Sequence, residues 1–328
     1  MVKEQLHNDN FSLYCGDCMH VLPQIESKSI DLSIYSPPFC GLYQYTSLPN
    51  DFSNCASKDE FLQQYEFLVK EISRITKSGR ITAVHCTDIL NTSTGELWDF
   101  PHEIIMLHKA NGFKYMNRIT IWKEPLTVKN RTMVKSLMHK QIVDDSTKCF
   151  TAMPDYLLIF KKTGENETPV THEFGLINTY YGSVPLLPFM IEKYGDYETL
   201  RKKYAGWKDP KTNKLSHVHW QRYASSVWDD IRIDNVVPFR ESKEEDDEKH
   251  IHPLQLDVID RIVELYSNPN EIVLTPFMGV GSEVYSAVSL GRKAIGIELK
   301  ESYYKQSVIN CKEADKRFLK VQQATLFE

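Results

Sequence analysis

The segment Ser33–Phe39 ends an apolar run with a hydroxyl group, two prolines and an aromatic ring. Two consecutive prolines remove two backbone N–H donors and fix φ near about −65°. Ser36 and Pro37 therefore offer acceptors, a hydroxyl oxygen and a carbonyl oxygen, and Phe39 offers a ring for stacking. A nucleobase extruded from a duplex presents the complementary groups, an exocyclic amine and a π face. The alternative interpretation is an ordinary turn, because X-Pro-Pro sequences end many strands.

A second segment whose residues could bind a ligand begins at Glu271. It combines a short apolar run with a glycine-containing turn. Gly279 and Gly281 can adopt positive φ and have no Cβ that would keep a ligand away. The helical pattern that follows offers its N-terminus to a polar ligand. The next apolar run ends at Glu298, and an acid at this position can accept both hydroxyls of a ribose. The third glycine of the dinucleotide fingerprint is missing, so the segment predicts a nucleoside ligand other than NAD.

Together these two motifs resemble the catalytic and cofactor motifs of the S-adenosylmethionine-dependent DNA amino-methyltransferases that modify cytosine N4 or adenine N6. The catalytic motif comes first, which resembles the circularly permuted beta group with a target-recognition region between the motifs. The resemblance covers roughly residues 11–125 and 250–310, and it includes Gly16-Asp17 and His252-Pro253-Leu254-Gln255. Two departures concern the methionine end of the cofactor. Thr275 stands where the family usually has Asp, and Ser282-Glu283 stands where Gly-Thr-Thr endings are common.

The resemblance assigns roles to individual residues. It implies that Ser36 and the Pro37 carbonyl accept the two hydrogens of the target amine and that Phe39 stacks on the base. The catalytic set is Ser36, Pro37, Pro38 and Phe39. The residues expected to bind S-adenosylmethionine are Asp17, Leu254, Gln255, Pro276, Phe277, Met278, Gly279, Gly281, Ser282 and Glu298.

Serine at the first motif position favours cytosine N4 over adenine N6 within the resembled family. Adenine N6 stays open, since the two amines have similar geometry. A protein glutamine N5-methyltransferase is a further alternative, although by resemblance its cofactor motif precedes its catalytic motif. The last alternative is an inactive DNA-binding relative. Such a relative is expected to have lost the Gly-x-Gly, which this sequence retains.

Basic residues gather in two segments, 123–140 and 193–222, although the net charge is −5. Affinity for phosphate depends on the local field rather than on the total charge, and the second segment also interleaves tyrosine and tryptophan. Solvated helix faces are the alternative. The residues expected to contact DNA are Lys129, Arg131, Lys135, Lys140, Arg201, Lys202, Lys203 and Arg222. The expected partner is double-stranded DNA. A cognate restriction endonuclease and a homodimer stay open, and no membrane partner is expected.

The apolar runs predict an α/β fold with a doubly wound, mostly parallel sheet. The resemblance implies that this sheet is a Rossmann-like methyltransferase fold, circularly permuted, with an inserted target-recognition region. Residues 1–125 are expected to form the catalytic half and residues 250–328 the cofactor half. The insert is expected to cover residues 126–240, with a late core strand near 156–160, and the acidic run 241–248 to be a linker. The expected strands are 11–14, 32–35, 81–85, 120–122, 156–160, 272–274 and 294–297, and the expected helices are 60–76, 254–266 and 284–290.

Seven cysteines, an odd number without regular spacing, predict reduced thiols. The single Cys15-x-x-Cys18 pair is expected to be buried and structural, so no metal is expected. The sequence has no apolar stretch of about 18 residues and no signal-peptide core, which favours a cytoplasmic location.

Overall fold

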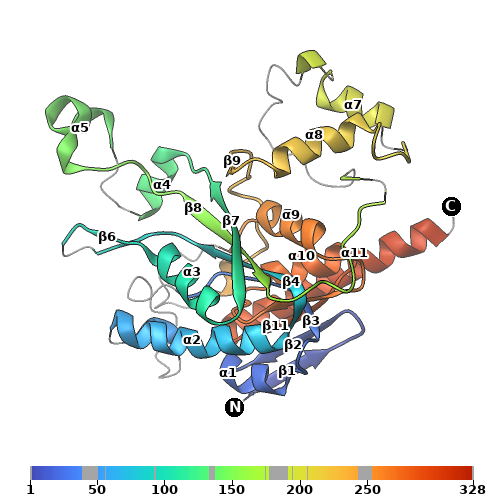
Figure 1. Cartoon of the computed structure of the whole chain (residues 1–328), viewed down its shortest axis with the longest axis horizontal. Helices are drawn as coiled ribbons and strands as arrows, with labels where there is room; N and C mark the ends of the chain where they lie inside the picture. Colours follow the sequence, from blue (N-terminus) through green and yellow to red (C-terminus); the bar gives the residue numbers. More distant parts are fainter. Residues whose placement is uncertain are drawn as a thin grey trace.

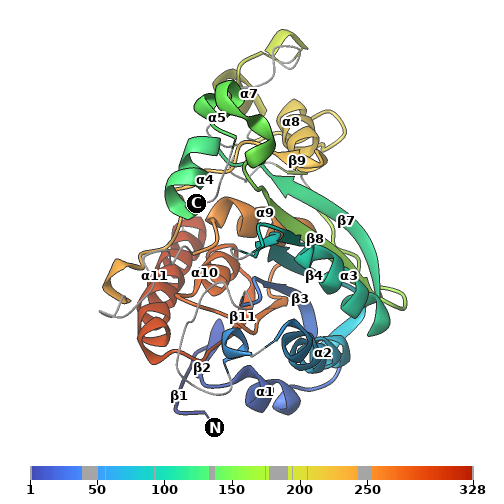
Figure 2. The same cartoon turned by 90° about the vertical axis from the view of Figure 1, so that its left-hand side faces the viewer.

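The computed structural model describes residues 2–38, 51–55, 57–91, 94–132, 137–173, 175–176, 191–193, 195–204, 206–242 and 253–326. Within these residues, one nine-stranded sheet lies between two layers of helices (Figures 1 and 2). Its strands are β1 (Glu4–His7), β2 (Phe11–Cys15), β3 (Ile30–Tyr35), β4 (Thr76–Cys86), β7 (Phe113–Ile121), β8 (Asp155–Lys162), β9 (Val227–Trp228), β10 (Ile272–Thr275) and β11 (Lys293–Glu298). A short hairpin of β5 (Ile89–Leu90) and β6 (Leu97–Trp98) forms a separate sheet.

The helices are divided between the two faces of the sheet and an outer region. They are α1 (Cys18–Val21), α2 (Lys58–Ile75), α3 (Phe100–Ala110), α4 (Pro125–Thr132), α5 (His139–Asp144), α7 (Tyr197–Tyr204), α8 (Lys214–Tyr223), α9 (Leu256–Tyr266), α10 (Ser282–Ser289) and α11 (Glu301–Leu326). Helices α1, α2 and α3 lie on one face, and α9, α10 and α11 lie on the other (Figure 2). Each face buries its own apolar cluster. In the described part of the chain, none of these helices combines the length and the apolar character needed to span a bilayer.

The strand order explains how two distant motifs meet. The sheet runs β1-β2-β11-β10-β3-β4-β8-β7-β9, so the C-terminal strands β10 and β11 are inserted between the N-terminal strands β2 and β3. The five strands from β2 to β4 are parallel. The chain moves in opposite directions across the sheet after β3 and after β10, which makes the gap between them a topological switch point.

The doubly wound, mostly parallel sheet confirms the predicted fold class. All six residues of β3 are buried, because a strand covered by helices on both faces has no solvent side. Each of the seven predicted strands is present, most of them longer than expected. The apolar stripe of α2 is core, as expected, and Ser57 caps this helix by accepting a hydrogen bond from the backbone N–H of Glu60.

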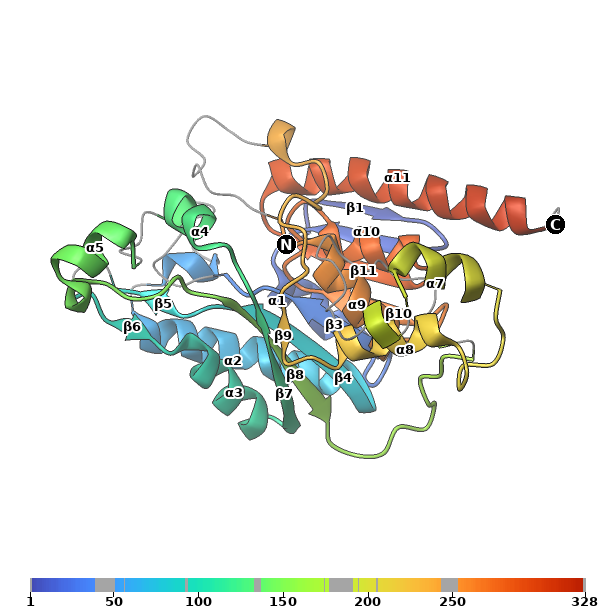
Figure 3. The same ribbon diagram turned by 90° about the horizontal axis from the view of Figure 1, so that it is seen from above.

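The segment between the two predicted halves is only partly an insert. Strand β8 pairs antiparallel with β4 and β7, and β9 pairs with β7, so residues 126–240 return to the sheet twice. The remaining parts form two separate projections, one with α4 and α5 and one with α7 and α8 (Figures 1 and 3). The predicted domain boundaries stay a prediction.

Candidate active site

The catalytic motif and the cofactor motif leave the sheet side by side. Leu274 of β10 is paired with Ser33 of β3, so Phe277 and Ser36 each lie three residues beyond that pair. Neighbouring strands lie about 4.8 Å apart. The rings of Phe277 and Tyr35 confirm this proximity, with centroids 6.0 Å apart in an edge-to-face arrangement.

Ser36 does not stand alone at the end of β3. Its Oγ lies 2.8 Å from Nδ1 of His85, a residue of the adjacent strand β4. Nε2 of His85 lies 3.0 Å from a carboxylate oxygen of Asp155, the first residue of β8. The same oxygen lies 2.5 Å from Nζ of Lys123, which follows β7. Four neighbouring strands thus each deliver one member of a hydrogen-bonded chain.

The register of the sheet puts these side chains on one face. Tyr35 is paired with Val84, and Ile121 with Asp155. The four members of the hydrogen-bonded chain therefore lie at the same edge of the sheet. Side chains alternate along a strand, and Ile34, Ala83 and Leu157 belong to the cluster on the α9 face. Ser36, His85 and Asp155 each lie two residues from one of these positions and therefore point to that same face.

Asp155 is held in its ionised form. Burial alone would raise the pKa of this carboxyl, but the positive charge of Lys123 and the contact with His85 lower the pKa well below its ordinary value. The Asp155 side chain is 9% exposed and that of His85 is 12% exposed, so little water competes for their hydrogen bond.

The cofactor loop has the open backbone that the sequence predicted at one of its two glycines. Gly279 has φ +54°, and a Cβ built on it would meet nothing within 4 Å. Its N–H donates to one carboxylate oxygen of Glu298 (2.7 Å), while the other oxygen accepts from the N–H of Lys300 (2.8 Å). Burial raises the pKa of Glu298 to about 7, and the charge of Asp51 adds to this rise.

The space around Gly281 differs from the one expected, although its contact with the cofactor stays a prediction. We expected a Cβ here to enter the path of the ligand. A Cβ on Gly281 would instead lie 3.0 Å from Ser307 and 3.1 Å from the sulfur of Cys311, both on α11. With φ +94° as well, this glycine is required by the packing of α10 against α11.

Three buried polar side chains lie around the loop in the described part of the chain. Within the described part of the chain, the hydroxyls of Thr275 and Ser282 have no hydrogen-bond partner. Glu283, in the first turn of α10, is 4% exposed and has no cationic partner among the described residues. Burial raises the pKa of its carboxyl to about 8, with a further contribution from Glu298.

The other predicted cofactor residues lie around the same strand ends. Asp17 follows β2, and the backbone N–H of Gly16 donates to the carbonyl of Glu298 (2.8 Å). The Asp17 carboxylate caps α1 by accepting from the Met19 N–H (2.9 Å). Leu254 and Gln255 precede α9 and are almost fully buried. Pro276 and Met278 are buried within the loop itself.

The predicted catalytic residues are only partly described. Ser36 and Pro38 are half-buried and Pro37 is buried, whereas Phe39 lies outside the described residues. Its stacking role therefore stays a prediction.

The predicted DNA contacts fall on both projections, with one correction. Lys129 and Lys140 lie on α4 and α5, and residues 201–203 are exposed on α7. Arg131 belongs to α4, but its side chain, like all of Lys135, is outside the described part. Arg222 was assigned wrongly, since it is 7% exposed and pairs with Asp229 at 3.0 Å. A cation buried and paired in this way is not available for phosphate.

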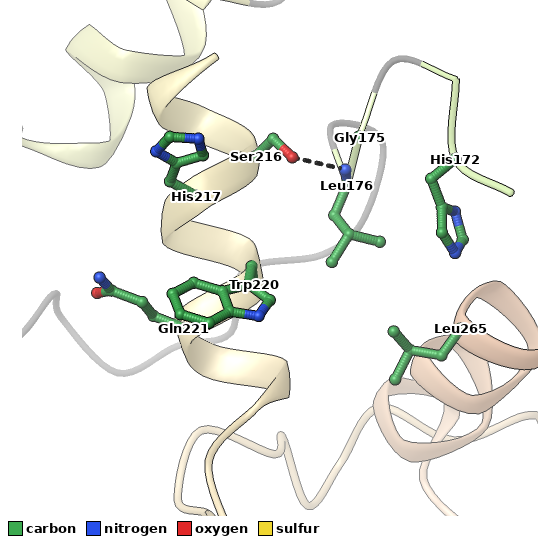
Figure 4. Close-up of a pocket in the computed structure, with 8 residues that line it drawn as sticks. All are labelled: His172, Gly175, Leu176, Ser216, His217, Trp220, Gln221 and Leu265. Atoms are coloured by element: carbon green, nitrogen blue, oxygen red, sulfur yellow. Dashed lines mark hydrogen bonds between the residues drawn. The ribbon is translucent and has the colours of Figure 1, made fainter. Parts of the chain in front are cut away.

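A pocket on the far side of the molecule is separate from these strand ends. It lies between α8, the C-terminal part of α9 and residues 172, 175 and 176, where Ser216 accepts a hydrogen bond from the backbone N–H of Leu176 (2.9 Å) (Figure 4). Leu265 lines this pocket. It lies ten residues beyond Gln255, or about 15 Å along the helix, so the pocket is not part of the candidate site.

A family model described as DNA methylase, of the N6/N4 type, matches residues 30–309. The chain belongs to this family. The resemblance drawn from its two motifs is thereby confirmed.

Individual relatives cover most of the chain at low identity. The type II methyltransferase M.BamHI of Bacillus amyloliquefaciens is 24% identical over 97% of this chain, which spans 61% of that relative's length. M1.MboII of Moraxella bovis is 23% identical over 89% of this chain and 92% of its own length. The DNA adenine methyltransferase YhdJ of Escherichia coli is 22% identical over 92% of this chain and 82% of its own.

Solved structures share the fold. The cytosine-N4-specific PvuII DNA methyltransferase superposes with a TM-score of 0.58 at 13% identity, covering 98% of this chain and 97% of its own. A Thermus thermophilus protein described as a DNA modification methylase, complexed with S-adenosyl-L-methionine, gives a TM-score of 0.57 at 19% identity. That comparison covers 93% of this chain and 96% of the other.

Sequence reasoning missed His85 and Asp155, and it placed Lys123 only in the basic segment 123–140. A signal was present for His85 and Asp155, because His85 ends one apolar run and Asp155 stands at the start of another. Their use could not be predicted, since it depends on β8 lying antiparallel beside β4, which puts the start of β8 at the end of β4.

Proposed function

We propose that this chain transfers a methyl group from S-adenosylmethionine to the exocyclic amine of a base extruded from double-stranded DNA, with cytosine N4 favoured over adenine N6. The observation that carries the proposal is the position of Ser36 Oγ. It lies one strand away from the open loop at Gly279, while its partner His85 belongs to β4, on the other side of β3 from that loop. An amine held at Ser36 would lie beside a ligand held at the loop.

The role of Ser36 follows from the weak nucleophilicity of an exocyclic amine, whose lone pair is delocalised into the ring. Hydrogen bonds from this amine to Ser36 Oγ and to the Pro37 carbonyl would favour a pyramidal nitrogen. They would also offset the positive charge that develops on the nitrogen. Holding the nitrogen within about 3 to 3.5 Å of the methyl carbon would supply much of the remaining acceleration.

The residues around the loop fit S-adenosylmethionine, which supplies an electrophilic methyl group on a sulfonium. The space above Gly279 admits a ligand that a Cβ would obstruct. Glu298 keeps lone pairs for ribose hydroxyls even while each of its oxygens accepts one backbone N–H. The unpartnered hydroxyls of Thr275 and Ser282 would gain partners from the amino-acid part of the ligand.

We place the phosphate contacts of the duplex on the two projections. Basic side chains that are exposed or half-buried occur on α4 and α5 in one projection and on α7 in the other. Lys123, which contacts Asp155 in the site, lies just before α4. We therefore assign Lys129, Lys140 and residues 201–203 to phosphate contacts. A cognate restriction endonuclease and a homodimer stay predictions.

The target base is decided by mass analysis of nucleosides. Unmethylated duplex DNA is incubated with the protein and methyl-labelled S-adenosylmethionine, then digested to nucleosides. Labelled N4-methylcytosine supports the favoured form of the proposal. Labelled N6-methyladenine would show that adenine is the target, as the name of the relative YhdJ says of that protein. Label in protein glutamine instead of DNA, or no transfer with a bound cofactor, would contradict the proposed function.

A further inference from the structure

The geometry points to His85 as the group that receives the proton lost by the target amine, with Ser36 as the relay and with Asp155 and Lys123 as positioning residues. This inference rests on the proposed function. It goes beyond it by assigning three residues that the two sequence motifs do not contain.

The first step is the tautomer of His85. Asp155 is ionised beside Lys123, and an ionised carboxylate can only accept hydrogen bonds. Nε2 of His85, 3.0 Å from this carboxylate, must therefore carry a hydrogen. In a neutral imidazole the other nitrogen is then an acceptor. Nδ1 consequently accepts the hydroxyl hydrogen of Ser36 at 2.8 Å.

The second step concerns the orientation of Ser36. Because its hydrogen points to His85, the oxygen presents its lone pairs to the substrate side. A serine hydroxyl could otherwise donate to the target nitrogen and occupy the lone pair that must attack. The His85–Asp155 pair thus makes a neutral hydroxyl behave as an acceptor at this position.

The third step is the balance of the transfer. The amine nitrogen forms a bond to the methyl carbon while the carbon–sulfur bond breaks, and the sulfur keeps that electron pair. The nitrogen now bears a positive charge and loses one hydrogen as a proton to Ser36 Oγ. The hydroxyl hydrogen of Ser36 moves to Nδ1 of His85. The products are the methylated amine, the thioether of the donor and an imidazolium paired with Asp155, which releases its proton to water later.

The charged groups around His85 come from every element packed against this edge. Asp155 and Lys123 belong to the hydrogen-bonded chain itself. Further charged groups lie near Cys86, the residue after His85, or on α9. The charges of Asp88, Asp99 and Arg118 affect the pKa of the neighbouring Cys86. On α9, Asp257 pairs with Arg232 and Arg261 pairs with Asp230. Among the described residues near the site, His85 alone combines a hydrogen bond to Ser36 with a bond to a carboxylate.

The test is the pH dependence of single-turnover methylation, with saturating S-adenosylmethionine and DNA, for the intact protein and for His85→Gln. We expect the intact protein to become faster as pH rises through one ionisation, because only neutral His85 can take the proton. His85→Gln should be about 10²-fold slower and should lose this ionisation. Its S-adenosylmethionine affinity and melting temperature should be unchanged, a result that a merely structural role would not give.

Two further variants complete the comparison. Asp155→Asn should also lose about 10²-fold, because an amide can donate to Nε2 and so reverse the tautomer. The matched control is His102→Gln, an exposed histidine on α3, which should keep the rate and the pH profile. If His85→Gln methylates at the original rate with the ionisation retained, the inference is overturned while the proposed function stands. If the intact protein methylates no base in DNA, both are overturned.

A measurement without substitution covers the case in which His85→Gln does not fold. In the ¹⁵N-histidine-labelled protein, the imidazole shifts of neutral His85 should show a protonated Nε2 and an unprotonated Nδ1. A neutral ring with its hydrogen on Nδ1 would donate to Ser36 and could not accept the hydroxyl hydrogen. This result would overturn the relay.

Discussion

The buried carboxyl of Glu283 allows a prediction about stability and its dependence on pH. Replacing Glu283 by Gln keeps the shape of the side chain and removes a group that is 4% exposed without a cationic partner among the described residues. We expect the Gln variant to unfold less readily than the original protein in alkaline solution and about equally readily in acid. The prediction concerns the protein without ligand.

The direction follows from proton binding. The folded-state pKa of Glu283 is raised to about 8, while an unfolded glutamate titrates near 4.5. Between these values the folded protein binds more protons than the unfolded chain, so its stability falls as pH rises through that window. Below the window both states hold a neutral carboxyl, which the amide imitates.

The magnitude follows from the size of the shift. One pKa unit corresponds to about 1.4 kcal/mol, so the shift sets an upper bound of about 5 kcal/mol on the cost of ionising Glu283 above pH 8. Relaxation and water entry reduce such penalties in real proteins. We therefore expect the Gln variant to gain roughly 2 kcal/mol or more in unfolding free energy in alkaline solution.

The assay is urea denaturation of both proteins at about pH 4 and about pH 8.5. The matched control is Glu313→Gln on α11, whose exposed carboxylate pairs with Arg317 at 2.9 Å. An exposed pair of this kind contributes little to stability. If Glu283→Gln is no more stable than the original protein at the higher pH, the carboxylate has a favourable partner in solution and the reasoning is refuted.

Three other predictions concern the site and its surroundings. Gly279→Ala should weaken S-adenosylmethionine binding at least about tenfold by calorimetry with a small loss of stability, whereas Gly281→Ala should lower the melting temperature through its contact with α11. Charge reversal at residues 201–203 should lower the salt slope of DNA binding by about 0.9 for each lost phosphate contact, while Arg222→Ala should destabilise the fold and leave that slope unchanged. Ser36→Ala should reduce turnover by about 10² to 10³-fold with normal cofactor affinity.

Each of these has an outcome that would contradict it. Equal effects of the two glycine variants on cofactor affinity would show that φ, rather than the open space above Gly279, decides binding. An unchanged salt slope after reversal at 201–203 would move the DNA surface elsewhere. Full activity in Ser36→Ala would remove the acceptor role from this hydroxyl.

The sequence predicted the fold because its strands are buried on both faces and appear as short apolar runs. β3 and β10 were found in this way, and their polar ends at Ser36 and Gly279 identified the two motifs. The membership of β8 in the sheet was foreseen, but its direction was not, since an apolar run carries no information on direction. His85, Asp155 and Lys123 come together only through that direction, so no local pattern could have joined them.

Edge and surface elements were harder to predict from the residues alone. β1 has mostly exposed residues and forms through its pairing with β2. Arg222 lies in a basic stretch that looks like a phosphate-binding surface, yet it is buried because α8 turns it toward Asp229. Gly281 was correctly recognised as a position that needs glycine, but the neighbour that requires it is α11, which is close in space and distant in sequence.

The insertion of β10 and β11 between β2 and β3 also determines when this protein can fold. A ribosome releases β2 and β3 long before the two strands that separate them in the sheet. Until then the inward edges of β2 and β3 carry unpaired backbone groups, and such edges pair readily with other chains. Closing the centre of the sheet requires contacts between residues as distant in sequence as Leu32 and Val273, and such long-range contacts slow folding. We therefore expect the nascent chain to depend on protection of these two edges until Glu298 has emerged, so the arrangement that builds the active site also makes synthesis its most aggregation-prone stage.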